Sequence, residues 1–303
     1  MKPEDIQRVL IIGGGTMGRQ IALHFAMHGC NVAIYDIQQE FLTKALTAIQ
    51  KMAGTYVRLK RITQEEAEAA IGRIKTTTVP EEAAMDIDLV SESIPEDPVL
   101  KGQVFSLFHN LCPPRTIFTT NTSTLLPSMI ASAAGRPGKF LALHFHDLRT
   151  NTVVDIMPHP GTDEEAIHAV QGFAKRMGLI DILMSRESSG YVFNAMLRAF
   201  LESAQTLAAN GISSIEDIDR SWMGVMNAPI GPFGLMDSIG IDTSWKVTAF
   251  WAKQTGDAQL QKNADFLKQF VDRGELGSKT GKGFYQYPGP SFRKPGFIAG
   301  KAT

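Results

Sequence analysis

The sequence has little of what marks several common classes of protein. It holds only two cysteines, Cys30 and Cys112, in 303 residues. Because they lack Cys-x-x-Cys spacing, we expect neither a disulfide framework nor a cysteine zinc site. Its 30 basic and 31 acidic side chains leave a formal charge of −1. Since the chain has no excess of positive charge, nucleic acid is not an expected partner.

Long hydrophobic runs are also missing. The first apolar run, residues 9–12, ends at a glycine, and it is too short for a signal-peptide core or a membrane span. We therefore expect a cytoplasmic protein with no membrane partner. Hydrophobic residues make up 44% of the chain and charged residues 20%, which is typical of a globular protein. A chain of this length favours two domains.

The sequence does contain a regular alternation of short apolar or β-branched runs with longer helical patterns, from residue 8 to about residue 186. This alternation predicts an α/β domain of the Rossmann type with a mostly parallel sheet. The runs expected to be strands are residues 8–12, 31–36, 74–78, 88–93, 116–120, 139–145, 152–157 and 179–184. Residues 38–73 interrupt the pattern and indicate an inserted helical hairpin, whose second helix begins near Thr63.

The pattern changes to successive helices after about residue 188. Apolar side chains recur at intervals of three and four between residues 192 and 207, which is the spacing of a buried helix face. We therefore expect an all-α C-terminal domain. The predicted boundary separates a Rossmann domain at residues 1–187 from a helical domain at residues 188–303.

A glycine loop follows the first predicted strand. Gly13, Gly15 and Gly18 fit the pattern G-x-G-x-x-G and open a predicted helix, where they allow a tight turn, a close approach of backbone to a pyrophosphate and close helix–strand packing. Asp36 ends the second strand, where its carboxylate can accept hydrogen bonds from ribose hydroxyls. Asp36 repels a 2′-phosphate, and residues 37–39 supply no cation. The loop predicts NAD as the cofactor; the alternative is a merely tight βα turn.

Polar side chains follow three successive predicted strands. They are Glu92, Glu96 and Lys101, then Asn121, Thr122 and Ser123, then His144. Ligands of open α/β sheets bind at the carboxyl ends of the strands. An imidazole there suits proton transfer coupled to hydride transfer, and Asp155 lies on the next strand, where it can orient the ring. The alternative for a lone histidine is a structural role.

Other clusters allow alternative interpretations. His144 and His146 with the adjacent Asp147 could bind a metal, as could the pair His24 and His28. Neither pattern is specific, and we expect no metal.

A basic group lies at the joint of the helical hairpin. Arg58, Lys60 and Arg61 could be a solvated surface or a site for a phosphate-bearing substrate.

Taken together, these motifs resemble the 3-hydroxyacyl-CoA dehydrogenase family over nearly the full chain. The family has an acidic residue five positions before a lysine, and Glu96 and Lys101 match this pair. Its Asn-Thr-Ser motif matches residues 121–123, and its catalytic histidine follows at His144. Its Gly-aromatic-Val-x-Asn motif matches residues 190–194. The segment GPFGLMDSIGID is similar to the family's Gly-Pro-Phe turn and the helix after it.

The resemblance implies an NAD-dependent enzyme that interconverts short (S)-3-hydroxyacyl-CoA and 3-oxoacyl-CoA. His144 is then the general acid/base, while Ser123 and Asn194 hydrogen-bond the reacting oxygen or the neighbouring carbonyl. Asn194 lies in the second domain, so the family's site forms between domains. The resemblance also implies a homodimer. Further expected contacts are Thr16, Met17, Glu96, Lys101 and Asn121 with NAD, and Arg58, Lys60 and Arg61 with CoA.

The loop after His144 departs from the family pattern. The family continues from its histidine as His-Phe-Phe-Asn-Pro and reaches a glutamate after twelve residues, whereas HFHDLRTNTVVD reaches Asp155 after eleven. Asp147 and Arg149 are expected to line the substrate entrance. This loop is similar to the diketoreductase-like branch, and MPHP to the lambda-crystallin branch. Two alternatives follow: a dehydrogenase of a free 3-hydroxy acid or diketo ester, and a non-catalytic NAD-binding protein.

Overall fold

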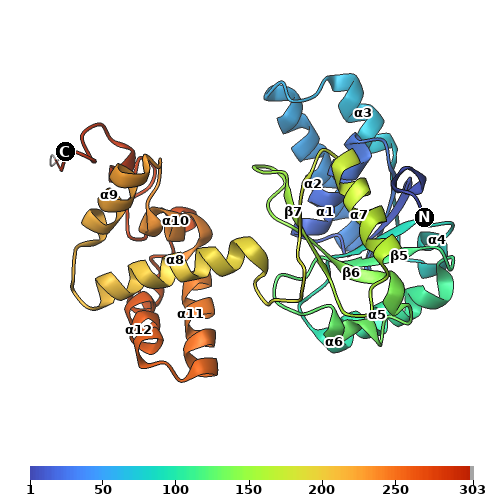
Figure 1. Cartoon of the computed structure of the whole chain (residues 1–303). Coiled ribbons are helices and arrows are strands. Elements are labelled where there is room, and N and C mark those ends of the chain that lie inside the picture. The colour runs from blue at the N-terminus through green and yellow to red at the C-terminus, as the bar shows by residue number, and fades with distance from the viewer. Residues whose placement is uncertain (301–303) are drawn as a thin grey trace. The chain divides into compact units, whose positions relative to one another are not determined.

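The computed structural model describes residues 1–300. The chain forms two compact units, Met1–Val192 and Phe193–Thr303, each with its own helices (Figure 1). The boundary expected after residue 187 falls on the amino-terminal side of this division. Within residues 1–300, every helix is too short or too polar to cross a membrane.

The first unit is built on one eight-stranded sheet in the order β3-β2-β1-β4-β5-β6-β7-β8. Its strands are β1 (Arg8–Ile12), β2 (Asn31–Tyr35), β3 (Ile74–Thr77), β4 (Leu89–Glu92), β5 (Ile117–Thr120), β6 (Phe140–Phe145), β7 (Val153–Pro158) and β8 (Ile180–Leu183). Every neighbouring pair is parallel except β6 and β7. The short loop between β6 and β7 permits only an antiparallel return. The predicted Rossmann-type, mostly parallel sheet is confirmed.

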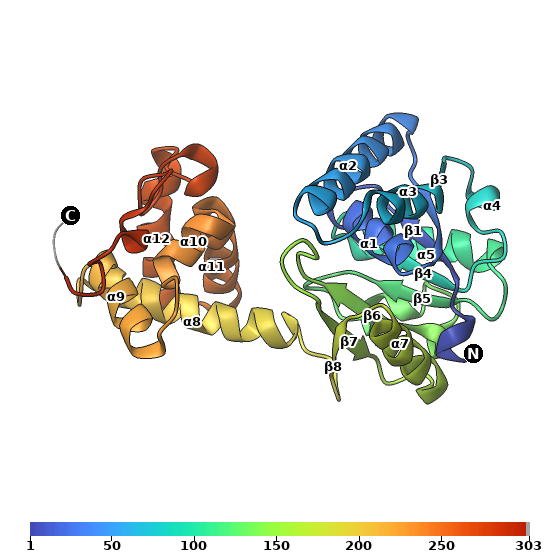
Figure 2. The ribbon, with the colours of Figure 1, turned by 90° about the horizontal axis from the view of Figure 1, so that it is seen from above.

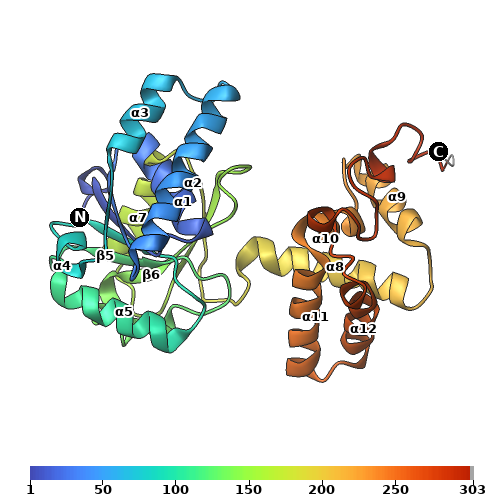
Figure 3. The same cartoon turned by 180° about the vertical axis from the view of Figure 1, so that it is seen from behind.

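Helices cover both faces of this sheet. They are α1 (Thr16–Met27), α2 (Gln39–Arg58), α3 (Gln64–Gly72), α4 (Pro80–Ala83), α5 (Pro98–Leu111), α6 (Ser128–Ala131) and α7 (Glu164–Arg176). Val9 and Ile11 pack in the cluster that contains α1, α2, α3 and α7, whereas Leu10 and Ile12 pack in the cluster that contains α4, α5 and α6. Successive side chains of a strand point to opposite faces, so β1 is buried on both sides, and α1 and α2 lie across the sheet from α5 (Figure 3).

The inserted hairpin consists of α2 and α3. Thr63 caps α3, because its hydroxyl accepts a hydrogen bond from Glu66 N while the Glu66 carboxylate accepts one from Thr63 N. This capping box fixes the start of the second helix, and Lys60 takes a left-handed conformation at the turn, with φ 55°. The predicted helical insertion is confirmed.

The second unit is entirely helical, as expected. It contains most of α8 (Tyr191–Ala209), with α9 (Ile215–Met226), α10 (Pro232–Ile239), α11 (Ile241–Thr255) and α12 (Ala258–Asp272). Helices α11 and α12 pack side by side (Figure 2). The core between the helices includes Phe233, Met236 and Leu267, all of them fully buried.

A buried carboxylate fastens this unit together. Asp219 of α9 is inaccessible to solvent and accepts hydrogen bonds from Phe233 N at 2.7 Å, Gly234 N at 2.9 Å and Tyr285 Oη at 2.8 Å. These bonds satisfy the first turn of α10 and tie the chain near Tyr285 to α9. Without Asp219, buried donors are left without an acceptor.

We therefore expect Asp219→Ala to lower the free energy of unfolding of the second unit by about 3 kcal/mol, as measured by urea denaturation. Glu216→Ala is the matched control on the same helix, because Glu216 is exposed and should change that free energy by about 0.5 kcal/mol or less. Equal unfolding midpoints for the two variants would contradict this role of Asp219.

Candidate active site

The glycine loop has the geometry that a bound dinucleotide requires. Gly13 adopts φ +100°, and a Cβ added there would lie 2.8 Å from the carbonyl oxygen of Ser93. A Cβ at Gly18 would overlap the carbonyl oxygen of Gly13, so α1 lies directly against the loop. Apart from Gly15 and its two chain neighbours, no residue of the range 1–300 has an atom within 4 Å of a Cβ added at Gly15, and no side chain caps the start of α1. The bare helix N-terminus is suited to bind a pyrophosphate.

Asp36 completes the nucleotide half of the site. It follows β2, and its carboxylate accepts hydrogen bonds from Gly14 N and Ile37 N, each at 2.8 Å. These bonds hold the carboxylate beside the glycine loop, where it can bind the hydroxyls of an adenosine ribose. The residues present therefore fit NAD.

A buried ion pair supports the edge of the sheet beyond β4. Lys101 and Glu92 are almost inaccessible to solvent, and Lys101 Nζ lies 2.5 Å from Glu92 Oε1 and 3.3 Å from Glu96 Oε2. Thr120 donates a hydrogen bond to Glu92 Oε2 at 2.6 Å. This network ties β4, β5 and the start of α5 together, and it fixes Glu96, a predicted cofactor residue.

Glu96 in turn organises the loop after β5. It accepts hydrogen bonds from Ser123 N at 3.1 Å, Thr124 Oγ1 at 2.8 Å and the Thr122 hydroxyl. Burial raises the pKa of Glu96, but these bonds and Lys101 outweigh it and hold that pKa below its usual range. An anionic Glu96 therefore shapes the loop that carries the predicted Ser123.

Asn121 joins that loop to β6. Its Oδ1 accepts a hydrogen bond from Phe145 N at 2.8 Å, next to His144. The loops after β4, β5 and β6 are therefore connected to one another. Asn194, another predicted site residue, belongs to the second unit.

His144 and Asp155 form a hydrogen-bonded pair. They lie directly opposite each other in the antiparallel register of β6 and β7, and His144 Nδ1 is 3.0 Å from Asp155 Oδ2. The exposed fractions are 5% for His144 and 1% for Asp155. With Nδ1 bonded to the carboxylate, Nε2 is the nitrogen left for proton transfer. Although the loop is one residue shorter than in the family pattern, this register places the Asp155 carboxylate within hydrogen-bond distance of His144.

Two aromatic side chains flank His144. His146 Nε2 lies 3.1 Å from the same Asp155 oxygen, and the Tyr191 ring stacks on the His144 ring with centroids 4.6 Å apart. Tyr191 adopts φ 52°, and its buried hydroxyl has no hydrogen-bond partner among residues 1–300. Burial raises the pKa of that hydroxyl, which keeps it protonated. Sequence reasoning assigned neither residue a role in the dyad, although both positions lie within motifs that it used.

The side chains that could bind a metal differ from both candidate groups in the sequence, because Asp155 and not Asp147 lies with the two histidines. His144, His146 and Asp155 offer ligand atoms within 4.8 Å of one another, whereas Asp147 pairs with Arg149. Hydrogen bonds between the imidazoles and the carboxylate explain the cluster without an ion. The expected absence of a metal stays a prediction.

The alternative pair on α1 has other partners. His24 Nε2 contacts Met177 O at 2.8 Å, and His28 Nδ1 contacts His24 O at 2.8 Å. Both histidines therefore have backbone partners that account for their positions.

A basic cavity of about 470 Å³ lies between α1, α2 and the loop after β6. Four cationic residues line it: Arg19, Lys51, Arg61 and Arg149. Arg61 Nη1 donates to Arg149 O at 2.8 Å, which connects the hairpin to the loop after His144. Among the predicted CoA residues, Arg61 lines the cavity, whereas Arg58 and Lys60 do not. Sequence reasoning missed Arg19 and Lys51, because neither belongs to a run of charge.

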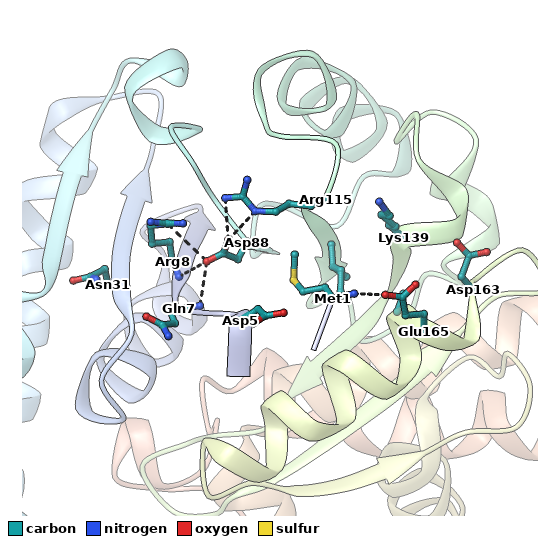
Figure 4. Close-up of a pocket in the computed structure, with 12 residues that line it drawn as sticks. Met1, Asp5, Gln7, Arg8, Asn31, Asp88, Arg115, Lys139, Asp163 and Glu165 are labelled. Atoms are coloured by element: carbon teal, nitrogen blue, oxygen red, sulfur yellow. Dashed lines mark hydrogen bonds and ion pairs between the residues drawn. The ribbon is translucent and has the colours of Figure 1, made fainter. Parts of the chain in front are cut away.

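A second cavity, of about 600 Å³, lies at the opposite edge of the sheet (Figure 4). It opens beside the amino ends of β1, β2 and β5, and its charges are largely paired within the protein. Asp88 accepts hydrogen bonds from Gln7 N, Arg8 N and Arg115, and the Met1 amino group pairs with Glu165. This network lies at the amino ends of the strands, whereas the predicted site residues lie at or beyond their carboxyl ends. We therefore assign the cavity no part in the chemistry.

Comparisons with known proteins give a consistent result. The family model for the NAD-binding domain of 3-hydroxyacyl-CoA dehydrogenase matches residues 8–188, and the model for its C-terminal domain matches residues 190–287. The probable 3-hydroxybutyryl-CoA dehydrogenase of Bacillus subtilis is 30% identical over 93% of this chain and 98% of its own length.

Solved structures are similar over the same range. A diketoreductase shares 36% identity with a TM-score of 0.87, and (S)-3-hydroxybutyryl-CoA dehydrogenase from Ralstonia eutropha shares 28% with a TM-score of 0.84. Each similarity covers 93% of this chain and 99% of the other. The relatives thus include proteins named for CoA thioesters and one named for dicarbonyl compounds.

Proposed function

Because the chain belongs to the 3-hydroxyacyl-CoA dehydrogenase family of NAD-dependent oxidoreductases, we propose that its own substrate is a short (S)-3-hydroxyacyl-CoA such as 3-hydroxybutyryl-CoA. The basic cavity carries this proposal. Arg19, Lys51, Arg61 and Arg149 line it, and the Arg61–Arg149 bond joins it to the loop after His144. CoA bears several phosphate charges, which such a cluster of cations binds well.

In the proposed mechanism, His144 is the general acid/base. NAD, when bound by the glycine loop and Asp36, supplies a nicotinamide that accepts a hydride from the substrate carbon. His144 Nε2 takes the proton of the substrate hydroxyl, and it returns that proton to the carbonyl oxygen in the reverse direction. Asp155 Oδ2 lies 3.0 Å from His144 Nδ1 and accepts its N–H. This bond leaves the lone pair on Nε2 before the proton is taken up, and the carboxylate stabilises the imidazolium that forms afterwards.

The remaining site residues keep the roles that the family resemblance implies. Ser123 and Asn194 hydrogen-bond the reacting oxygen or the neighbouring carbonyl. The proposed cofactor contacts, in addition to the glycines and Asp36, are Thr16, Met17, Glu96, Lys101 and Asn121.

A second candidate is the same chemistry on a free 3-hydroxy acid or a diketo ester. The similarity to a diketoreductase favours it, as does the polar Asp147–Arg149 pair in the loop after His144. A single carboxylate, however, needs fewer cations than this cavity offers. The non-catalytic alternative rested on the shortened loop, and the hydrogen bond between His144 and Asp155 removes that argument.

A steady-state assay of NADH oxidation tests the choice between substrates. We expect acetoacetyl-CoA to have a kcat/KM at least about a hundredfold above those of acetoacetate and a diketo ester, since about 3 kcal/mol of phosphate binding is lost with the free compounds. Turnover of the free compounds alone would reject the CoA thioester.

The basic cavity makes a separate prediction. Lys51→Gln is expected to raise KM for acetoacetyl-CoA about fivefold and to leave kcat unchanged, because one exposed charge–phosphate contact contributes about 1 kcal/mol. Lys60→Gln is the matched control, since Lys60 is a neighbouring exposed lysine that does not line the cavity. If the two substitutions have equal effects, the cavity is not the CoA site.

We also propose that the helical unit mediates homodimerisation. Met196 is 61% exposed, Phe250 55% and Val247 44%, and large apolar side chains at a surface are typical of protein interfaces. Sedimentation velocity at several concentrations measures the assembly state. The cytoplasmic location stays a prediction.

A further inference from the structure

Asp155 has two imidazole partners, and the second is not part of the family pattern described above. His144 Nδ1 lies 3.0 Å and His146 Nε2 3.1 Å from the same oxygen, Oδ2. We infer that His146 is a positioning residue that acts through Asp155 to hold His144 for proton transfer. The inference rests on the proposed role of His144.

The strand geometry brings the three side chains together. His144 lies on β6, and His146 follows two residues later, just beyond the end of that strand. Side chains two apart on an extended chain point to the same face, and Asp155 projects from the facing position of β7. The two imidazole rings lie 4.8 Å apart at 75°, so each approaches the carboxylate from a different direction.

The carboxylate depends on these two bonds. Asp155 is 1% exposed, and its Oδ1 has no hydrogen-bond partner among residues 1–300. The hydrogen bonds from His144 and His146 both fall on Oδ2. Burial raises the pKa of Asp155, but the bonds from His144 and His146 outweigh it and hold that pKa below its usual range.

Loss of His146 would therefore leave a buried carboxylate with one donor. Such a group is under-satisfied, so it can rotate about χ1 or take up a proton. In either case the acceptor for His144 Nδ1–H is no longer fixed, and a smaller share of His144 has its lone pair on Nε2. The effect falls on the chemical step and not on substrate binding.

Two substitutions at residue 146 separate hydrogen bonding from packing. His146→Phe installs the family's residue and removes the donor, whereas His146→Gln keeps an N–H group. For the full-length enzyme we expect His146→Phe to lower kcat about tenfold with KM nearly unchanged, as for loss of an orienting partner. His146→Gln should stay within about threefold of wild type. Equal kcat values for the Phe and Gln variants would overturn the inference.

A double-mutant cycle tests whether His146 acts through Asp155. In an Asp155→Asn background, His146→Phe should change kcat by less than about twofold, because the carboxylate that it positions is already gone. A full tenfold loss in that background would overturn the inference. Both tests use whichever substrate the wild type reduces, so a wrong choice between CoA thioester and free compound leaves them intact.

Discussion

Replacing His144 with glutamine is expected to lower kcat about a thousandfold and to leave NADH binding unchanged. General acid–base catalysis contributes about 10²–10⁴-fold in rate, and a glutamine amide cannot take up or release the proton. His144 is buried and bonded to Asp155, and two strands, β4 and β5, separate its strand β6 from β1, which leads into the glycine loop. Steady-state rates with acetoacetyl-CoA, together with NADH fluorescence titration, measure the two effects separately.

His168→Gln is the control for this substitution. His168 is exposed on α7 and should leave both kcat and NADH affinity at wild-type values. A His144→Gln enzyme with a kcat within about threefold of wild type would contradict the proposed mechanism. Loss of NADH binding in that variant would instead show a role for His144 in the cofactor site.

The second large effect is expected at Gly18. A Cβ there would overlap the carbonyl oxygen of Gly13, so Gly18→Ala must move the start of α1 away from the loop. Overpacking of this kind costs about 1–3 kcal/mol in unfolding free energy. Because the moved segment is the proposed pyrophosphate site, we expect the Kd for NADH to rise at least about tenfold, as measured by isothermal titration.

Gly72→Ala provides the matched control. Gly72 belongs to helix α3, and apart from its chain neighbours and the backbone of that helix no atom of residues 1–300 lies within 4 Å of a Cβ added there. Since alanine is a better helix former than glycine by about 1 kcal/mol, this variant should be slightly more stable and bind NADH normally. Normal NADH affinity in the Gly18→Ala variant would contradict the assignment of the loop.

The sheet could be predicted because its strands have local sequence signals. β1 is apolar from Val9 to Ile12 and is followed directly by Gly13, and Gly18 and Asp36 follow at the spacing that a dinucleotide loop requires. The direction of the β6–β7 pair was not predicted. The connection between these strands, residues 146–152, is too short for the crossover that a parallel pair needs, so its length carried a signal that the alternation of strands and helices does not.

The site was predictable in part. The position of His144 and Asp155 on consecutive predicted strands indicated a possible pair, but the sequence left open whether a shorter acid could reach. The cross-strand register answers that question. Tyr191 could not be predicted as a neighbour of His144, because its ring is placed by a positive φ angle, which an L-residue other than glycine rarely adopts.

The basic cavity shows the limit of reading charge along a chain. Arg58, Lys60 and Arg61 are neighbours in sequence, yet of these three only Arg61 lines the cavity. Arg61 shares the cavity with residues from α1, from the middle of α2 and from the loop after β6. The fold brings these distant segments together, so the spacing of charges along the sequence could not predict the cavity.

We propose that this chain is an NAD-dependent (S)-3-hydroxyacyl-CoA dehydrogenase. The most direct measurement is the initial rate of NADH formation with NAD⁺, or of NADPH formation with NADP⁺, from (S)- and from (R)-3-hydroxybutyryl-CoA. We predict turnover of the (S)-thioester with NAD⁺, and a rate at least about a hundredfold lower for the (R)-thioester or for NADP⁺, which the Asp36 carboxylate repels. Equal rates for the two enantiomers, or no turnover of either thioester, would contradict the claim.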